Sequence, residues 1–156
     1  MDVDVSLEAR CSAEELFVWV DDLGRYPQWL DLVPRAEAAS AVDGDPGPAW
    51  AVDLQARLGP LARSKRLRMV RTVHEPPAAP QDGAHPPAVA RFERREHDAR
   101  EHSAWSLEAR VDALGDRSSR LTMHLHYGGG LFGPVVEGLL REEVRCSRPR
   151  LLALVE

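Results

Sequence analysis

The C-terminal stretch, residues 131–156, constrains the fold more than any other part of this sequence. Its apolar residues recur at spacings of four and seven, which places them on one face of a helix: Val136, Leu140, Val144 and Leu151. Pro134 suits the first turn of this helix, whereas Pro149 predicts a kink or a break near Arg148. A helix with so continuous an apolar stripe needs a large apolar surface, and we expect the preceding residues to supply it.

Length and composition indicate one globular domain, residues 1–156, with a hydrophobic core. The formal net charge of −5 argues against nucleic acid as a partner, because phosphate binding needs a concentrated basic surface. No apolar run approaches the roughly 20 residues that span a bilayer. The N-terminus has neither the basic start nor the apolar core of a signal peptide. We therefore expect a cytoplasmic protein without an integral membrane segment, and the sequence leaves open whether it forms a homodimer.

The first part of the chain predicts a strand followed by two short helices. Val3, Val5 and Leu7 alternate with polar residues, as in a half-buried strand. Ser12 and Glu15 have the spacing of a capping box that begins a helix. The second helix is expected over residues 26–30, with a proline in its first turn and another closing it.

Six further strands are expected after these helices. Alternation of apolar and polar residues indicates strands over residues 50–58, 63–73, 88–96, 103–111 and 121–127, with a weaker candidate over 36–41. Most are joined by turns, and the Pro- and Ala-rich residues 74–87 predict a mobile loop. Hairpin-joined strands form an antiparallel sheet, and one long helix covering its apolar face makes an α+β domain of two layers.

A curved sheet around one helix tends to leave a cavity, and apolar cavities bind small hydrophobic molecules. We expect its ligand-binding walls to come from residues on apolar faces: Trp50, Leu54, Met69, Phe92, Trp105, Leu107, Met123, Leu125, Tyr127, Val136 and Leu140. Arg71 also falls on an apolar strand face. A guanidinium stays charged, so its burial demands an anionic or carbonyl partner. Arg71 could anchor the polar end of a ligand, pair with a buried Glu, or lie beyond the sheet edge after a bulge.

Metal, cofactor and nucleophile motifs are weak in this sequence. Cys11 and Cys146 are too few for a disulfide framework, and we expect two reduced, partly buried thiols. His124 and His126 share one strand face and could provide half of a zinc site. No further pair stands at a ligand spacing, so solvated outer-face histidines are the preferred interpretation, with a cavity-facing acid or base as the alternative. No cofactor is expected.

Several segments together form a recognisable pattern: residues 12–20 (SAEELFVWV), Asp22-Leu23, Tyr26-Pro27 with Trp29, the strand at Trp105-Ser106-Leu107, the hairpin from Gly115 to Leu121, and the long final helix. This pattern resembles START-like (SRPBCC) proteins, and most of all their polyketide cyclase/dehydrase and lipid-transport family. The resemblance implies a helix-grip fold: a curved antiparallel sheet of about seven strands around the C-terminal helix, with a hydrophobic cavity between them. Members include ligand carriers, aromatic-polyketide cyclases, hormone receptors and proteins that partner others.

The sequence is therefore consistent with three functions. The first is binding or transport of a small hydrophobic ligand, lipid or polyketide-like, with Arg71, Tyr127 and the loop near His85 orienting or gating it. The second is a cyclase- or dehydrase-type enzyme, which would need an inward acid or base such as Glu143. The third is a protein-interaction module. The resemblance transfers no catalytic motif, so no catalytic residue is assigned.

Overall fold

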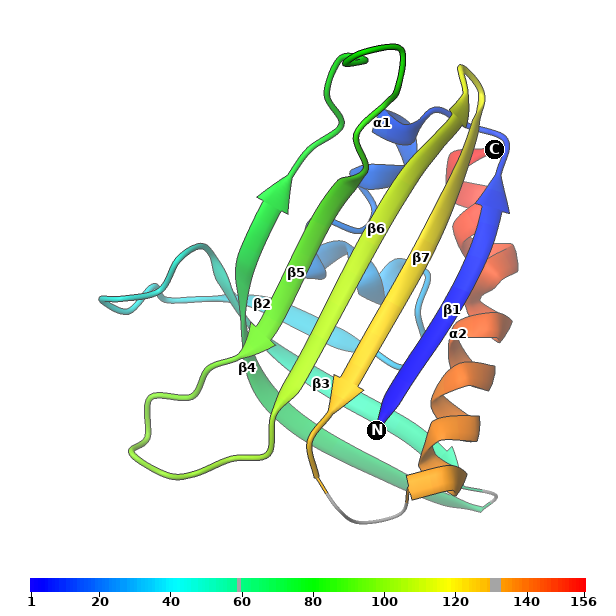
Figure 1. Cartoon of the computed structure of the whole chain (residues 1–156). Coiled ribbons are helices and arrows are strands. Elements are labelled where there is room, and N and C mark those ends of the chain that lie inside the picture. The colour runs from blue at the N-terminus through cyan, green and yellow to red at the C-terminus, as the bar shows by residue number, and fades with distance from the viewer. Residues whose placement is uncertain (59, 130–132) are drawn as a thin grey trace.

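The structure is a computed structural model that describes residues 1–58, 60–129 and 133–156, without the side chains of 57, 58, 61–63 and 133–136. Its elements in chain order are β1 (Asp2–Ala9), α1 (Ala13–Phe17), the 3-10 helix η1 (Leu23–Gln28), β2 (Arg35–Ala39), β3 (Ala49–Leu58), β4 (Leu61–Glu75), β5 (Ala88–Arg94), β6 (Trp105–Gly115), β7 (Ser118–Tyr127) and α2 (Gly133–Val155) (Figure 1). The strands form one antiparallel sheet in the order β1-β7-β6-β5-β4-β3-β2. The expected α+β architecture with about seven strands is confirmed.

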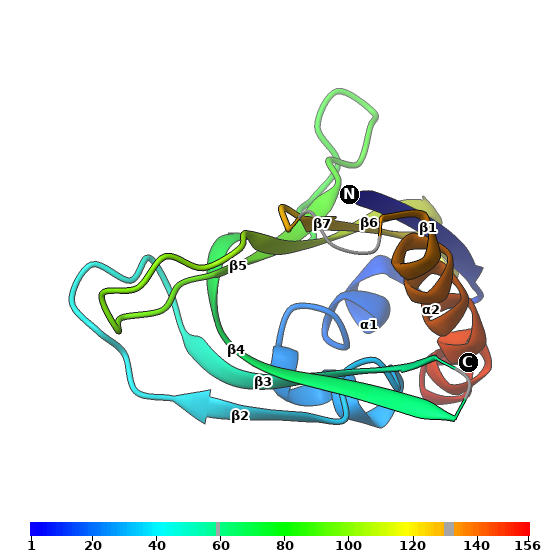
Figure 2. The same ribbon diagram turned by 90° about the horizontal axis from the view of Figure 1, so that it is seen from below.

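The sheet bends strongly, as Figure 2 shows: β2, β3 and β4 lie across from β6, β7 and β1. The short helices α1 and η1 lie between these two halves, and α2 closes the remaining side beside β1. The apolar face of the sheet is therefore covered by three helices, whereas the sequence predicted that the final helix does most of this. None of the helices in the described ranges is long and apolar enough to cross a membrane.

The first helix begins where the sequence predicts it. The Ser12 hydroxyl accepts from the Glu15 backbone N–H at 3.1 Å, and the Glu15 carboxylate accepts from the Ser12 N–H at 2.9 Å. This reciprocal pairing satisfies two N–H groups that a helix start leaves free. The second expected helix is a 3-10 turn and starts earlier than predicted, because the Asp22 side chain accepts from the Gly24 N–H and fixes its first turn.

Two aromatic side chains, one in η1 and one directly after it, donate hydrogen bonds to the turn that follows α1. The Tyr26 hydroxyl donates to the Val20 carbonyl at 2.9 Å, and Trp29 Nε1 donates to the Trp19 carbonyl at 3.1 Å. Both rings are fully buried, so their polar atoms need these partners. Burial raises the pKa of the Tyr26 phenol, which keeps the hydroxyl protonated and able to donate. The aromatic residues of the N-terminal pattern thus have structural contacts.

The final helix continues through Pro149, so of the predicted kink or break near Arg148 the break is wrong. Proline removes one backbone hydrogen bond and crowds the preceding turn, at about 3 kcal/mol. Packing on both sides of the proline offsets this cost: Val144 is buried before it, and Leu151 is fully buried after it. Leu140 is buried as predicted, whereas the side chain of Val136 lies outside the described residues.

Candidate functional site

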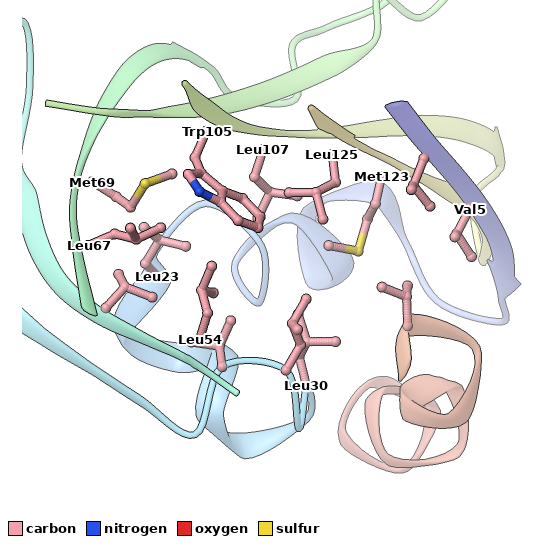
Figure 3. Close-up of a pocket in the computed structure, with 15 residues that line it drawn as sticks. Val5, Leu23, Leu30, Leu54, Leu67, Met69, Trp105, Leu107, Met123 and Leu125 are labelled. Atoms are coloured by element: carbon pink, nitrogen blue, oxygen red, sulfur yellow. The ribbon is translucent and has the colours of Figure 1, made fainter. Parts of the chain in front are cut away.

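An apolar pocket lies on the concave side of the sheet (Figure 3). Its walls come from β1, β3, β4, β6 and β7, and its other side from η1, the segment after η1, and α2. All of its lining residues carry hydrocarbon, thioether or indole side chains: Val3, Val5, Leu23, Leu30, Leu32, Val33, Val52, Leu54, Leu67, Met69, Trp105, Leu107, Met123, Leu125 and Val144. The site can therefore offer burial of apolar surface and very little polar recognition.

The pocket is small. The volume open to the centres of water molecules is about 40 Å³. One water needs roughly 10–15 Å³ by this measure, so the space admits a few waters. Pockets that hold drug-sized ligands have volumes of roughly 300–1,000 Å³. A ligand in this pocket must either be very small or displace side chains that now fill the space.

The strand walls follow from alternation, because every second side chain of a strand points to the same face. Cross-strand partners then meet inside the pocket: Leu107 lies opposite Leu125, which in turn lies opposite Val3 on β1. On the other half of the sheet, Val52 of β3 lies opposite Leu67 of β4. The register of the hairpins therefore builds a continuous aliphatic surface.

On the remaining side of the pocket, the sequence predicted a wall from the C-terminal helix but not these residues. That side consists of Leu23 at the start of η1, the segment with Leu30, Leu32 and Val33, and Val144 of α2. All five side chains are buried. The sequence signals that could have indicated them are the apolar cluster just before Pro34 and the helical stripe that includes Val144. The pocket is thus bounded by η1 and its following loop as much as by the C-terminal helix.

Six of the predicted wall residues line the pocket: Leu54, Met69, Trp105, Leu107, Met123 and Leu125. Trp50 and Phe92 do not. They pack edge to face with ring centroids 5.6 Å apart, and Phe92 also contacts Tyr26 at 6.2 Å. This aromatic cluster is buried in the core, so these two residues belong to packing.

Tyr127 and Leu140 also lie outside the pocket lining. Tyr127 is partly buried and packs against the ring of Trp105, with centroids 4.5 Å apart. Tyr127 lies opposite Trp105 on the neighbouring strand and packs beside this pocket residue, which alternation alone could not distinguish from a direct contact with the pocket. His85, expected near a gate, lines a separate polar hollow with Ser12 and Glu14.

Arg71, expected as a ligand contact, does not line the pocket. Its Nη1 donates to the backbone carbonyl of Asp21 at 3.0 Å, so one of the five N–H groups of the guanidinium is paired with the connection after α1. A register shift interrupts the pairing of β4 with β5 between Arg71 and Val73. The anchoring of a ligand's polar end by Arg71 stays a prediction, and the lining of this pocket does not include Arg71.

The two histidines of β7 lie on the convex face of the sheet, where the outer-face interpretation places them. His124 Nδ1 lies 2.7 Å from an Asp4 carboxylate oxygen, and His126 Nδ1 lies 2.8 Å from Asp2. The hydrogen bond to Asp4 raises the pKa of His124 above its usual value. Within the described residues, no group of three or more His, Cys, Asp or Glu side chains is placed to hold a metal ion.

No titratable acid or base lines the pocket in the described part of the chain. Glu143, the one acidic candidate from the sequence, lines a separate hollow with Asp31, Pro34 and Gln55. The one polar atom among the lining side chains is the indole Nε1 of Trp105. That atom is buried, and no described residue accepts a hydrogen bond from it.

No protein-family model matches the sequence, and no curated protein matches it. Solved structures do match. A START superfamily protein from Mycobacterium smegmatis superposes with a TM-score of 0.67 at 18% identity, covering 99% of this chain and 96% of that one. Human StAR-related lipid transfer protein 5 superposes with a TM-score of 0.72 at 14% identity, covering 97% and 74%.

The chain has a START-like, helix-grip fold. The fold implied by the sequence resemblance is therefore confirmed. A norcoclaurine synthase from Thalictrum shares the START-like arrangement, with a TM-score of 0.59 at 14% identity over 97% of this chain and 91% of that one. A lipid transfer protein and an enzyme thus have the same architecture, so the fold alone does not choose between binding and catalysis.

Proposed function

We propose that this START-like chain binds a small hydrophobic molecule, of lipid or polyketide-like character, in the apolar pocket beneath its curved sheet. The observation that carries the proposal is the composition of the lining, in which the walls from five strands, η1 and α2 are all apolar. Burying apolar ligand surface there yields about 25 cal/mol per Å². The similarity to a human lipid transfer protein supports the same class of ligand.

Binding requires the pocket to widen, because its present volume of about 40 Å³ is small. Two of the lining side chains, Met69 and Met123, are well suited to this. Methionine is unbranched, with three rotatable bonds, and adapts its shape at modest cost. We expect these two side chains to change rotamer when a ligand enters.

Binding or transport is favoured over turnover. An enzyme of the cyclase or dehydrase type would need a general acid or base within hydrogen-bond reach of its substrate. The described pocket-lining residues include no carboxylate, imidazole, phenol or amine. The enzyme hypothesis therefore has no candidate residue in this pocket.

A second candidate, a protein-interaction module, is favoured by the small size of the pocket alone. In that case the side chains would fill the space permanently, and the protein would bind no small ligand. The described large apolar side chains that are well exposed are Val18, Val42, Leu114 and Leu154, on four separate segments. Their scatter gives this candidate no defined contact surface.

The proposal is tested by filling the pocket. Leu125 of β7 lines the pocket, and Leu125→Phe adds volume where a ligand would lie. The matched control is His126→Phe, the next residue on the same strand, whose side chain is on the opposite face. We expect Leu125→Phe to weaken binding of a fluorescent fatty-acyl probe by at least about tenfold, and His126→Phe to leave it within about twofold.

Equal affinities of the unaltered protein and the Leu125→Phe variant would contradict the proposed site. Failure of the unaltered protein to bind any hydrophobic probe would favour the interaction module. Both variants should first be shown to unfold cooperatively in urea, so that lost affinity reflects the pocket and not the fold.

A further inference from the structure

Trp105 presents an unusual polar atom in an otherwise apolar site. Its ring points into the pocket between Met69 and Leu107, and the ring nitrogen lies on the side of Met69 (Figure 3). Nε1 is buried, and none of the described residues accepts its hydrogen. The other face of the ring is held by Tyr127, with centroids 4.5 Å apart and an angle of 33° between the planes. The N–H is therefore fixed in direction by packing.

A buried N–H without an acceptor is unfavourable, and folded proteins leave few such groups. Trp29 allows a comparison: its ring is also buried, yet its Nε1 donates to the Trp19 carbonyl at 3.1 Å. The fold thus satisfies the indole of a structural tryptophan and leaves that of the pocket tryptophan free among the described residues.

A water molecule is a poor partner for this N–H. Well-held buried waters make two to four hydrogen bonds with polar groups around them. Apart from the indole, every lining side chain of the pocket is a hydrocarbon or a thioether. A ligand atom attached to an apolar body would accept from Nε1 and bury the surrounding surface at the same time.

Resting on the proposed function, we propose that the ligand is an uncharged apolar molecule with one hydrogen-bond acceptor, a carbonyl or ether oxygen, that accepts from Trp105 Nε1. A single donor and an apolar enclosure cannot compensate the desolvation of a carboxylate or a phosphate. Arg71, the cation that the sequence suggested as a ligand contact, does not line the pocket and donates to the Asp21 carbonyl. The pocket thereby selects a ketone-, ester- or ether-type ligand over an ionised lipid.

The test uses two probes of similar shape, acetophenone and α-methylstyrene. Acetophenone carries a C=O group at the position where α-methylstyrene carries a C=CH₂ group. Each is titrated into ¹⁵N-labelled protein while the indole N–H signals are followed, and the Trp105 signal is identified by its loss in Trp105→Phe. We expect acetophenone to move the Trp105 indole proton downfield, as hydrogen bonding does. α-Methylstyrene should bind without that downfield shift.

Affinities in Trp105→Phe complete the test, because phenylalanine keeps an aromatic wall and removes the N–H. We expect acetophenone to bind about 3- to 10-fold more weakly, the factor that one neutral hydrogen bond supplies. α-Methylstyrene should stay within about twofold. Trp19→Phe is the matched control, since Trp19 does not line the pocket, and both probes should bind it unchanged.

Equal losses for the two probes in Trp105→Phe, or no loss for acetophenone, would overturn the assigned role of the N–H while hydrophobic binding itself stands. Failure of both probes and of the fatty-acyl probe to bind the unaltered protein would overturn the proposed function, and this inference with it. Binding of the fatty-acyl probe alone would overturn this inference while the proposed function stands. An upfield or absent shift of the Trp105 indole proton with bound acetophenone would also contradict the hydrogen bond.

Discussion

Two regions beneath the same curved sheet are filled in different ways. Between η1, β3 and β5, aromatic rings interlock: Tyr26 packs against Trp29 with centroids 5.0 Å apart, and Phe92 contacts both Tyr26 and Trp50. Around the pocket, the inward side chains of β1, β3, β4, β6 and β7 are mostly leucine, valine and methionine, and space remains between them. One region is packed by large rigid rings, whereas the other is lined by smaller and more adaptable side chains.

The difference teaches where space for a ligand can exist. Large rings that fit edge to face fill a core at high density and leave few voids. The pocket walls are aliphatic or thioether side chains apart from the single ring of Trp105, and Met69 and Met123 can move aside. We infer that the aromatic cluster carries stability and that the aliphatic region carries binding.

The largest expected effect is on the aromatic cluster. Phe92 is fully buried between Tyr26 and Trp50, so Phe92→Ala should lower the free energy of unfolding by about 3–5 kcal/mol. Urea unfolding measures the loss. The affinity of folded Phe92→Ala protein for the fatty-acyl probe should change little, because Phe92 does not line the pocket. A loss below about 1 kcal/mol would contradict the assignment of this region to the core.

Trp105→Ala should have a smaller effect on stability, about 2 kcal/mol. The ring is only partly buried and already borders open space, so its removal enlarges a pocket and creates no new void in the core. The same change should markedly alter probe affinity. A cost equal to that of Phe92→Ala, measured under the same conditions, would show that the two regions do not differ as described.

The smallest effect is expected on the convex face. His124 is 40% exposed and bonds Asp4, with Asp2 at 3.2 Å from its other ring nitrogen. Since its folded pKa is raised above 6.5, the pair stabilises the fold fully below that pH. The contribution is lost as the pH rises through the folded pKa.

Asp4→Asn should therefore flatten the decline in stability above pH 6.5, by less than about 1 kcal/mol because the pair is exposed. Thermal melts at several pH values follow this change. Probe affinity should be the same as in the unaltered protein at every pH. A pH-dependent affinity that disappears in Asp4→Asn would connect the convex face to the pocket and break the separation proposed here.

Much of the fold could be predicted from the sequence, because alternation and capping are local signals. The strands, the capping box at Ser12 and the apolar stripe through Leu140 and Val144 follow from spacing alone. The break predicted at Pro149 does not occur. The local cost of the proline is visible in the sequence, whereas the burial of Leu151 beyond it, which offsets that cost, is a tertiary effect.

The pocket could be predicted only in part. Alternation identified the face of each strand, so Leu107, Met123 and Leu125 were found. It could not show how far along the strand the space lies, so the filled end with Trp50 and Phe92 was assigned to the pocket as well. Which connection folds beneath the sheet, and which carbonyl meets Arg71, depends on long-range packing that no local pattern encodes.

The most direct test of the central claim is native mass spectrometry of the purified protein, followed by extraction into organic solvent and identification of the extract. We predict a bound species at one per chain, uncharged and apolar, that is absent from the Leu125→Phe variant and present in His126→Phe. An empty protein that also binds neither acetophenone nor a fatty-acyl probe would contradict the claim that this pocket holds a ligand.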